Sequence, residues 1–107
     1  MFEKLFIQAI HDKKKIELTF FSKEDGHLLT RTCAPMDFGP SRRAVDKSDR
    51  YHLWDYDSDT KVHTLSLKKE QVKDMLALQE HFNPAEFITW STVTSPWFIK
   101  RDWGTFS

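Results

Sequence analysis

The sequence has little cysteine, little glycine and no long apolar run. Its 107 residues include a single cysteine, Cys33, which excludes an internal disulfide and is typical of a reducing compartment. Its three glycines are scattered, so no glycine-rich loop is present to hold phosphates. No apolar run approaches the roughly 18 residues that cross a membrane, and the charged N-terminus does not resemble a signal peptide. We therefore expect a cytoplasmic protein with no membrane partner.

The sequence also lacks an excess of charge of either sign. Its 16 Lys and Arg residues equal its 16 Asp and Glu residues, so nucleic-acid binding would require a local basic patch. Aromatic residues are abundant, with nine Phe and four Trp. The hydrophobic fraction of 39% is enough for a folded core, which excludes a wholly disordered chain. We expect one domain over residues 1–107.

Catalytic and metal-binding patterns are missing as well. The five His residues do not have the close spacing of a metal site, and the single cysteine has no second cysteine to act with. No Ser or Cys nucleophile lies in a recognisable motif. We therefore predict that the chain is not an enzyme and holds neither a metal nor another cofactor.

The most informative stretch is a predicted hairpin. Residues 50–57 form an aromatic-rich strand, residues 58–60 a polar turn, and residues 61–67 a strand that alternates with period two. This turn predicts three cross-strand pairs, which are Asp57 with Lys61, Asp55 with His63, and Leu53 with Leu65. An Asp–His pair can orient a catalytic base, but it is more often a surface charge pair, which is the interpretation we favour.

The residues before this hairpin predict a helix and a first pair of strands. Apolar residues repeat with helical spacing over residues 1–12, and this amphipathic helix must dock on its own sheet, which we favour, or on a partner chain. Residues 16–21 alternate as a strand whose inward face carries Ile16, Leu18 and Phe20. The Asp25-Gly26 turn then leads to a return strand that ends near Met36. Pro35 indicates a strand end, an edge or a bulge.

The residues after the hairpin are harder to assign. Residues 68–71 predict one helical turn, and residues 72–78 are either a strand or a continuation of that helix. Asn83, Pro84 and Glu86 form a favourable helix start. Residues 88–93 are β-branched and aromatic, which predicts a further strand.

Cations cluster in the predicted loop over residues 37–49. Arg42, Arg43 and Lys47 lie there, and Arg50 follows directly. A long loop within a compact domain is usually functional or disordered, and a cluster of arginines can bind phosphates. The alternative is a solvated charged loop.

Aromatic rings and cations also alternate along the chain, most clearly in the Trp-rich residues 88–107. Base stacking on such rings contributes about 1–3 kcal/mol per base. The alternative is that most of the rings fill the core, and we favour it for any individual ring.

The order of these features resembles the WYL domain of bacteria, which is named for a Trp-Tyr-Leu triplet at the start of a strand. The similarity rests on an Ile-x-Leu-x-Phe strand, the Asp-Gly turn, Arg31 and Pro35 in an Arg-x-x-x-Pro pattern, the triplet Tyr51-His52-Leu53, and Asp57. It covers about residues 5–87. The resemblance implies a small SH3-like or Sm-like β-barrel, and a regulatory domain that senses ligands, in some members nucleic acid.

Proteins of that family usually carry a helix-turn-helix before the WYL domain, whereas here we expect a stand-alone WYL-like domain. At the basic positions that the family has after the central hairpin, this chain has Ser66 and Lys69. The expected fold is mainly β with short helices. Its parts are an N-terminal amphipathic helix over residues 1–12, a barrel over residues 16–87, and a Trp-rich extension over residues 88–107.

Two functions follow from these observations. The first, which we favour, is a non-enzymatic, ligand-sensing regulatory module that binds single-stranded nucleic acid or a small anionic ligand. Its candidate residues are Arg31, Arg42, Arg43, Arg50, Tyr51, His52 and Lys69. The second is a protein interaction or oligomerisation module that forms a homo-oligomer or docks on a separate regulator through the N-terminal helix or the Trp-rich extension.

Overall fold

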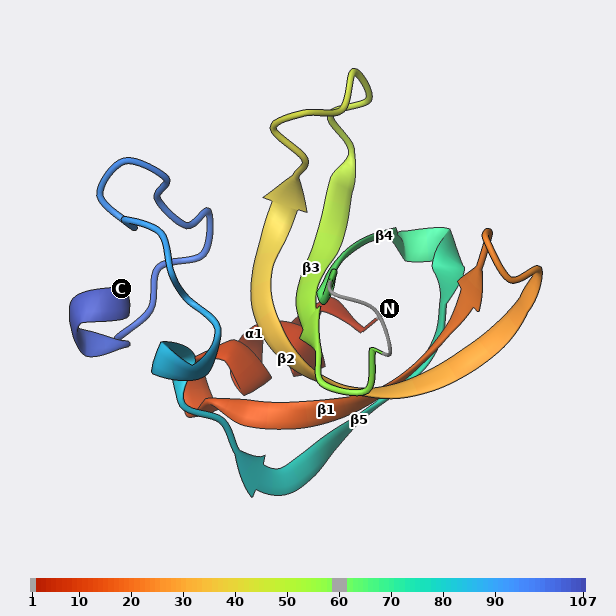
Figure 1. Ribbon diagram of the computed structural model, residues 1–107, viewed down its shortest axis with the longest axis horizontal. Helices are drawn as coiled ribbons and strands as arrows, with labels where there is room; N and C mark the ends of the chain where they lie inside the picture. Colours follow the sequence, from red (N-terminus) through yellow and green to blue (C-terminus); the bar gives the residue numbers. More distant parts are fainter. Residues whose placement is uncertain (1, 59–61) are drawn as a thin grey trace.

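The computed structural model describes residues 2–58 and 62–107 (Figure 1). One α-helix precedes five strands, which are α1 (Glu3–Asp12), β1 (Lys14–Ser22), β2 (His27–Pro40), β3 (Asp49–Asp55), β4 (Thr64–Lys68) and β5 (Val72–His81). Three single-turn 3-10 helices complete the described elements, which are η1 (Lys69–Gln71), η2 (Pro84–Glu86) and η3 (Gly104–Phe106). The prediction of a mainly β fold with an N-terminal helix is confirmed. No described helix has the length and apolar character needed to span a membrane.

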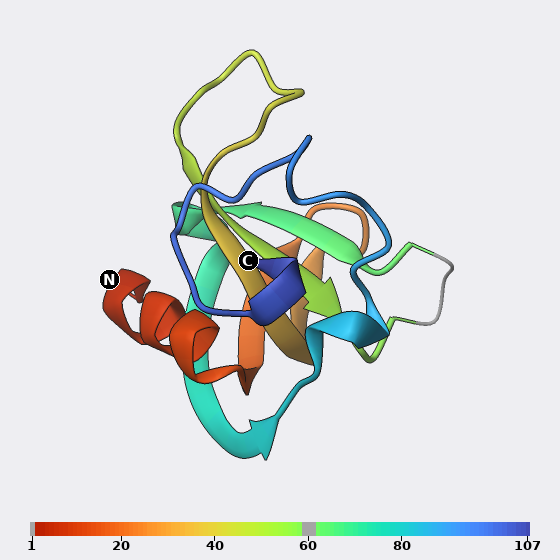
Figure 2. The ribbon, with the colours of Figure 1, turned by 90° about the vertical axis from the view of Figure 1, so that its left-hand side faces the viewer.

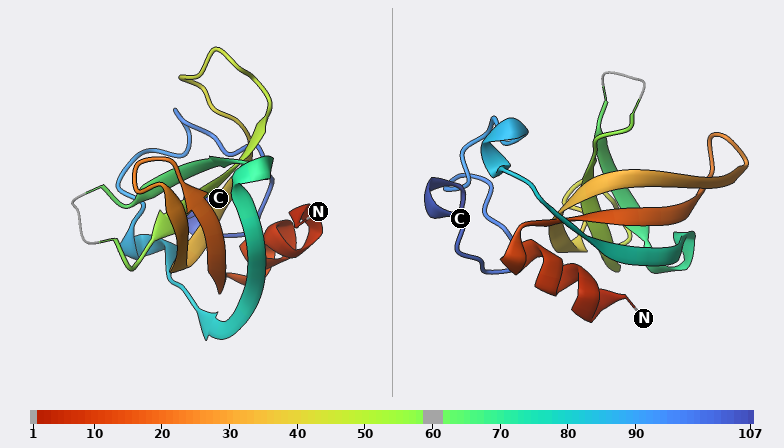
Figure 3. Two further views of the ribbon diagram at one scale, coloured as in Figure 1. Left: turned by 90° about the vertical axis from the view of Figure 1, so that its right-hand side faces the viewer. Right: turned by 90° about the horizontal axis from the view of Figure 1, so that it is seen from below.

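The five strands form one antiparallel sheet in the order β4-β3-β2-β1-β5. The sheet curls strongly, and η1 connects the two strands that lie at its edges (Figure 3). No ladder joins β4 to β5 in the described part of the chain, so the sheet is open there. The closed barrel expected from the WYL resemblance is therefore not confirmed.

The core lies between α1 and the concave face of the sheet. Phe6, Ala9 and Ile10 of α1 are buried, and they pack with the inward side chains of β1. These inward side chains are Ile16, Leu18 and Phe20, as the alternation predicted. The amphipathic helix thus docks on its own sheet, and each fully buried side chain contributes roughly 1.5–3 kcal/mol.

The β1–β2 hairpin follows the prediction, but its second strand is longer. Gly26 has a φ of +73°, which a residue without Cβ adopts at no steric cost. Strand β2 continues to Pro40, so the start of the predicted loop is strand instead. Pro35 lies at a bulge, because it pairs with Leu53 while Asp37 pairs with the preceding residue of β3. Met36 is the additional residue of this bulge.

The central hairpin has the predicted register. Leu53 pairs with Leu65, and the Asp55 N–H donates to the His63 carbonyl oxygen at 2.7 Å. The strands end at Asp55 and resume at Thr64, so the connection is longer than the expected three residues. The predicted pair of Asp57 with Lys61 lies outside the described residues.

The C-terminal part contains one confirmed cap and one wrong strand. Asn83 caps η2 by accepting the Ala85 N–H at 3.0 Å, while Glu86 accepts the Asn83 N–H at 3.0 Å. The undecided residues 72–78 belong to a strand, β5. Residues 88–93 do not form the predicted strand. The Ser91 hydroxyl accepts the Val93 N–H, and the Ser91 carbonyl oxygen accepts the Ser95 N–H at 3.0 Å. Such local bonds compete with a strand ladder. Figure 2 shows that the chain instead continues from η2 without a strand.

Candidate binding groove

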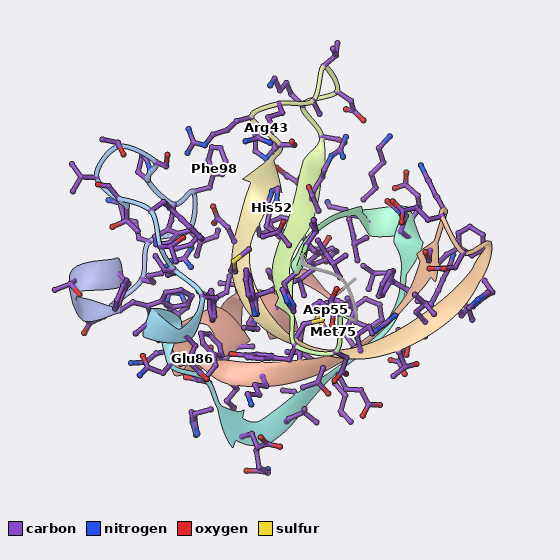
Figure 4. All side chains as sticks on the ribbon, in the orientation of Figure 1. Arg43, His52, Asp55, Met75, Glu86 and Phe98 are labelled. Atoms are coloured by element: carbon purple, nitrogen blue, oxygen red, sulfur yellow. The ribbon has the colours of Figure 1, made fainter. Side chains whose placement is uncertain are left out.

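A groove lies between the end of β2 with its following loop, the outer face of β3 and β4, and the C-terminal segment. It encloses about 330 Å³, which is within the usual range for small-ligand pockets. We call it the basic groove, and its walls include Arg42, Arg43, His52, Trp90, Trp97 and Phe98. Arg43, His52 and Phe98 lie on the same side of the molecule in Figure 4. The structure thus brings three of the predicted site residues together, which are Arg42, Arg43 and His52.

The two arginines of the groove have different roles. Arg42 donates from Nη2 to the Pro96 carbonyl oxygen at 2.6 Å, and its guanidinium lies 4.7 Å from the centre of the Phe98 ring. It therefore ties the loop to the C-terminal segment. Arg43 is exposed and forms no ion pair or hydrogen bond with another described residue. Its five N–H donors are free to bind an anion.

His52 is fixed at the base of the groove. Its Nε2 donates to the Gly39 carbonyl oxygen at 2.9 Å, so the proton is on that nitrogen. The ring is half-buried, on the outer face of β3. Nδ1 is left as the nitrogen that can serve a ligand.

The C-terminal wall of the groove is held by a buried carboxylate, that of Asp37. Its oxygens accept the backbone N–H groups of Phe98 at 2.9 Å, Ile99 at 3.0 Å and Phe38 at 3.0 Å. They also accept Arg101 Nη2 at 3.1 Å. Asp37 is part of the β2 bulge, and bulges re-aim side chains in this way. One carboxylate thereby joins the sheet to a segment more than 60 residues away in the sequence.

Arg101 is the partner of this carboxylate, and its side chain is fully buried. The guanidinium lies between two rings, 4.1 Å from the centre of Trp97 and 4.5 Å from that of Trp103. It also donates to the Met36 carbonyl oxygen. Burial lowers the pKa of Arg101 to about 10 while the Asp37 charge opposes this shift, so the side chain stays charged at neutral pH.

The surrounding rings anchor the segment further. Trp103 donates from Nε1 to the carbonyl oxygen of Ile10 at the end of α1, at 2.9 Å. Trp97 donates to the Phe106 carbonyl oxygen at 2.8 Å. Trp90, in contrast, is 37% exposed. The rings deeper in the segment therefore hold it in place, and the ring at the groove is accessible.

A glycine allows the close approach of the segment to β2. A Cβ on Gly39 would lie 2.7 Å from Phe98 Cδ2, which is closer than van der Waals contact permits. Only glycine lets the ring of Phe98 lie on the strand backbone at this point.

Sequence reasoning did not identify Asp37, Gly39 or Arg101. Their partners are distant in the sequence, and strand periodicity carries no information about them. The only signal was the occurrence of two Trp residues beside two cations near the C-terminus.

Arg31 lies in a different hollow, on the inner side of the open edge between β4 and the β1–β2 hairpin. We call it the open-edge hollow; it encloses about 650 Å³, and its lining includes Phe20, Leu29, Arg31, Asp55, Leu65 and Leu67. Arg31 donates from Nη1 to the Asp57 carbonyl oxygen at 2.6 Å, and its Nε lies 3.9 Å from Asp55 Oδ2. Burial raises the pKa of Asp55, and the Arg31 charge opposes this only in part.

The predicted Asp–His pair is present in the backbone register but not as a charge pair. His63 Nδ1 donates to the Asp55 carbonyl oxygen at 2.8 Å, whereas the carboxylate of Asp55 accepts the Asp57 N–H at 2.9 Å. The imidazole therefore does not meet the carboxylate. No cluster of three or more potential metal ligands is present among the described residues.

The remaining predicted residues do not line the basic groove. Tyr51 is in the core, with 1% exposure, beside Phe6 and Phe38. Lys69 Nζ lies 3.3 Å from Glu3 Oε1, at the start of α1. Arg50 is half-buried in β3, and its Nε has no hydrogen-bond partner among the described residues.

Comparisons with known proteins give a match in fold. No family model and no curated protein sequence matches the chain. Among solved structures, the proteasome accessory factor B/C (PafBC) of Arthrobacter aurescens is similar. It aligns with 85% of this chain at a TM-score of 0.57 and 13% sequence identity. This likeness shows the fold alone. The match spans 12% of the length of PafBC.

Proposed function

We propose that this chain is a WYL-like, non-enzymatic binding module of a regulatory system, and that it binds a single-stranded nucleic-acid segment or a small anionic ligand in the basic groove. The observation that carries this proposal is the exposed Arg43 beside the accessible rings of Trp90 and Phe98. The match to PafBC supports this proposal at the level of the fold. On this view the open sheet is an SH3-like or Sm-like barrel without a ladder between its edge strands.

The groove offers the two interactions that a nucleotide needs. A guanidinium binds phosphate through two parallel hydrogen bonds, and Arg43 has no partner to displace. Trp90 and Phe98 are 37% and 44% exposed, and the Arg42 guanidinium lies over the Phe98 ring, so Trp90 is the ring that is more open to a base. Stacking contributes about 1–3 kcal/mol per base and tolerates any sequence. The groove therefore favours a charged ligand that contains a planar ring.

The chain has no net charge, so long-range attraction of a polyanion is weak. Binding then depends on the few contacts within the groove. We expect a shallow dependence of affinity on salt, corresponding to about one or two neutralised phosphates.

Several observations support a binding role over catalysis. The imidazole of His63 contacts a backbone carbonyl and not the carboxylate of Asp55. Cys33 is fully buried, and burial raises the pKa of its thiol, with the charges of Asp55 and Asp57 acting in the same direction. A thiol of raised pKa is a poor nucleophile.

Fluorescence anisotropy tests the proposal. Labelled single-stranded DNA, single-stranded RNA and duplex DNA are titrated at two salt concentrations against the wild-type chain, Arg43→Ala and Lys4→Ala. Lys4 is an exposed cation of α1, away from the groove, and serves as the charge-matched control. We expect binding to single strands that weakens with salt, a loss of about tenfold for Arg43→Ala, and no change for Lys4→Ala. Equal losses in both variants, or no binding to any probe at low salt, would exclude the nucleic-acid form of the proposal.

Protein interaction is the second candidate function, and a different feature favours it. The two segments expected to mediate it, α1 and the Trp-rich extension, both pack on the chain's own sheet. The free edge of β4 is the feature that remains available.

A further inference from the structure

Strand β4 has a free edge with unpaired backbone groups. In an antiparallel ladder, hydrogen-bonded pairs alternate with non-hydrogen-bonded pairs. Because the Asp55 N–H donates to the His63 carbonyl, the next hydrogen-bonded pairs place Leu65 and Leu67 toward β3. The N–H and C=O groups of Thr64 and Ser66 therefore point away from β3. None of them forms a hydrogen bond with another residue that the structure describes.

The outer face of this edge adjoins the basic groove. Thr64 and Ser66 are exposed and lie on the same face as His52, and all three residues line the groove. Arg42 and Arg43 stand across it. A side chain that projects outward from a strand beside β4 would therefore enter a positively charged environment.

The inner face of the same edge adjoins the open-edge hollow. Leu65 and Leu67 point to this side, where Phe20 and Leu29 from the β1–β2 hairpin lie opposite. The hollow lies between β4 and the β1–β2 hairpin. A side chain that projects inward from a strand beside β4 would therefore meet Phe20 and Leu29, in a hollow whose lining also includes charged side chains such as Arg31 and Asp55.

We propose that β4 receives an extended segment of a partner protein as an additional strand, in which acidic and apolar residues alternate. Partner residues opposite Thr64 and Ser66 point into the basic groove, so these are the acidic positions. Partner residues opposite Leu65 and Leu67 point into the open-edge hollow, so these are the apolar positions. Main-chain hydrogen bonds to an edge strand give affinity, and pockets for alternate side chains give specificity.

The backbone pattern favours a polypeptide as the occupant. Thr64 and Ser66 present N–H and C=O groups at the spacing of an extended chain, and only another backbone offers matching donors and acceptors at that repeat. The proposal goes beyond the groove's ligand binding and does not rest on it, although Arg43 serves both. An open sheet edge of this kind is usually covered or paired in natural proteins.

Ser66→Pro is the test variant, because proline lacks the N–H that the partner would use. That N–H faces the free edge, so the ladder with β3 keeps its hydrogen bonds and proline is tolerated there. Ser66→Thr is the matched control, since it keeps the backbone donor. Circular dichroism and thermal unfolding verify that both variants are folded.

The probe is a labelled peptide of about seven residues, a common strand length, in which Glu alternates with Val and Leu. We expect binding in about the micromolar range to the wild-type chain and to Ser66→Thr. A loss of about tenfold or more is expected for Ser66→Pro, and a similar loss when Lys replaces Glu in the peptide. A peptide N-methylated on alternate amides should not bind the wild-type chain, and this measurement holds even if Ser66→Pro does not fold.

Three results would overturn the proposal. The first is undiminished binding of peptides N-methylated in either of the two alternating registers, and the second is undiminished peptide binding by folded Ser66→Pro. The third is self-association of the chain that Ser66→Pro abolishes, together with no peptide binding. That result would assign the edge to a second copy of the chain. Single-stranded DNA binding is measured on the same variants. If Ser66→Pro still binds DNA and no peptide binds the wild-type chain, only the strand-addition proposal fails. If the peptide binds and no nucleic acid does, only the nucleic-acid proposal fails.

Discussion

The basic groove and the open-edge hollow lie on opposite faces of one sheet, and each contains a buried carboxylate. Asp37, at the groove, accepts three backbone N–H groups and pairs with a buried guanidinium at 3.1 Å. Asp55, at the hollow, accepts one backbone N–H at 2.9 Å and lies 3.9 Å from Arg31. A carboxylate with many donors is a structural anchor, whereas one with few donors is costly to ionise.

The groove and the hollow therefore differ in how their structures are stabilised. The groove is assembled from distant segments and depends on a few strong contacts. The hollow lies on the curved inner side of the sheet, and its apolar side chains come from three strands, β1, β2 and β4. Damage to the groove should therefore follow from single polar substitutions, and the hollow should tolerate them.

The largest expected effect comes from Asp37→Ala. It leaves Arg101 as an unpaired buried charge, so the free energy of unfolding should fall by about 3–5 kcal/mol. Urea unfolding measures this, and limited proteolysis should show cleavage within residues 88–107. The exposed Glu24→Ala is the control and should change stability by less than about 0.5 kcal/mol. Equal stabilities for the two variants would show that Asp37 is not the anchor.

Gly39→Ala should have an intermediate effect. The new Cβ would overlap the Phe98 ring, and such overpacking costs about 1–3 kcal/mol. Urea unfolding gives the cost, and the NMR signals of Phe98 report whether the ring moves. Ser41→Ala, in the same wall of the groove, should leave both unchanged. If Phe98 keeps its position and stability is unaltered, the close approach at Gly39 is not required.

Asp55→Asn should have the smallest effect and the opposite sign. Burial raises the pKa of Asp55 in the folded state, so ionisation of this carboxyl group destabilises the fold. The free energy of unfolding should therefore fall as pH rises from the unfolded pKa of about 4 through the folded pKa. Asparagine stays neutral and still accepts the Asp57 N–H. At pH 7 the variant should be more stable by up to about 1 kcal/mol, and the gain should vanish below about pH 4.

Thermal unfolding of both chains at pH 4 and pH 7 tests this sign. If Asp55→Asn is less stable at pH 7, the ion pair with Arg31 outweighs the cost of burial.

The features that could be predicted from the sequence are those that depend on local contacts. Alternation identified the inward residues of β1, because a buried face imposes period two, and the expected turn over residues 58–60 predicted the register of Leu53 with Leu65. Pro35 indicated a strand end, an edge or a bulge because proline lacks a ladder donor, and the structure has the bulge. These features are local, and local physical chemistry determines them.

The groove was predictable only in part. Arg42, Arg43 and His52 were expected from charge and resemblance, and they lie together. The pairing of Asp37 with Arg101 joins distant segments, so no local pattern contains it. Residues 88–93 have strand propensity, but local hydrogen bonds of Ser91 override it. Tyr51 fits the family triplet, yet its ring fills the core.

The central claim is that the basic groove binds an anionic ligand with a planar ring. The most direct test is a two-dimensional NMR titration with single-stranded DNA that follows the indole N–H signals of the four Trp residues. The signal of the exposed Trp90 should shift together with the backbone amides of Arg42 and Arg43. That of Trp103, which donates to Ile10 in the core, should stay in place. Shifts confined to α1 or β5, with Trp90 unchanged, would contradict the claim.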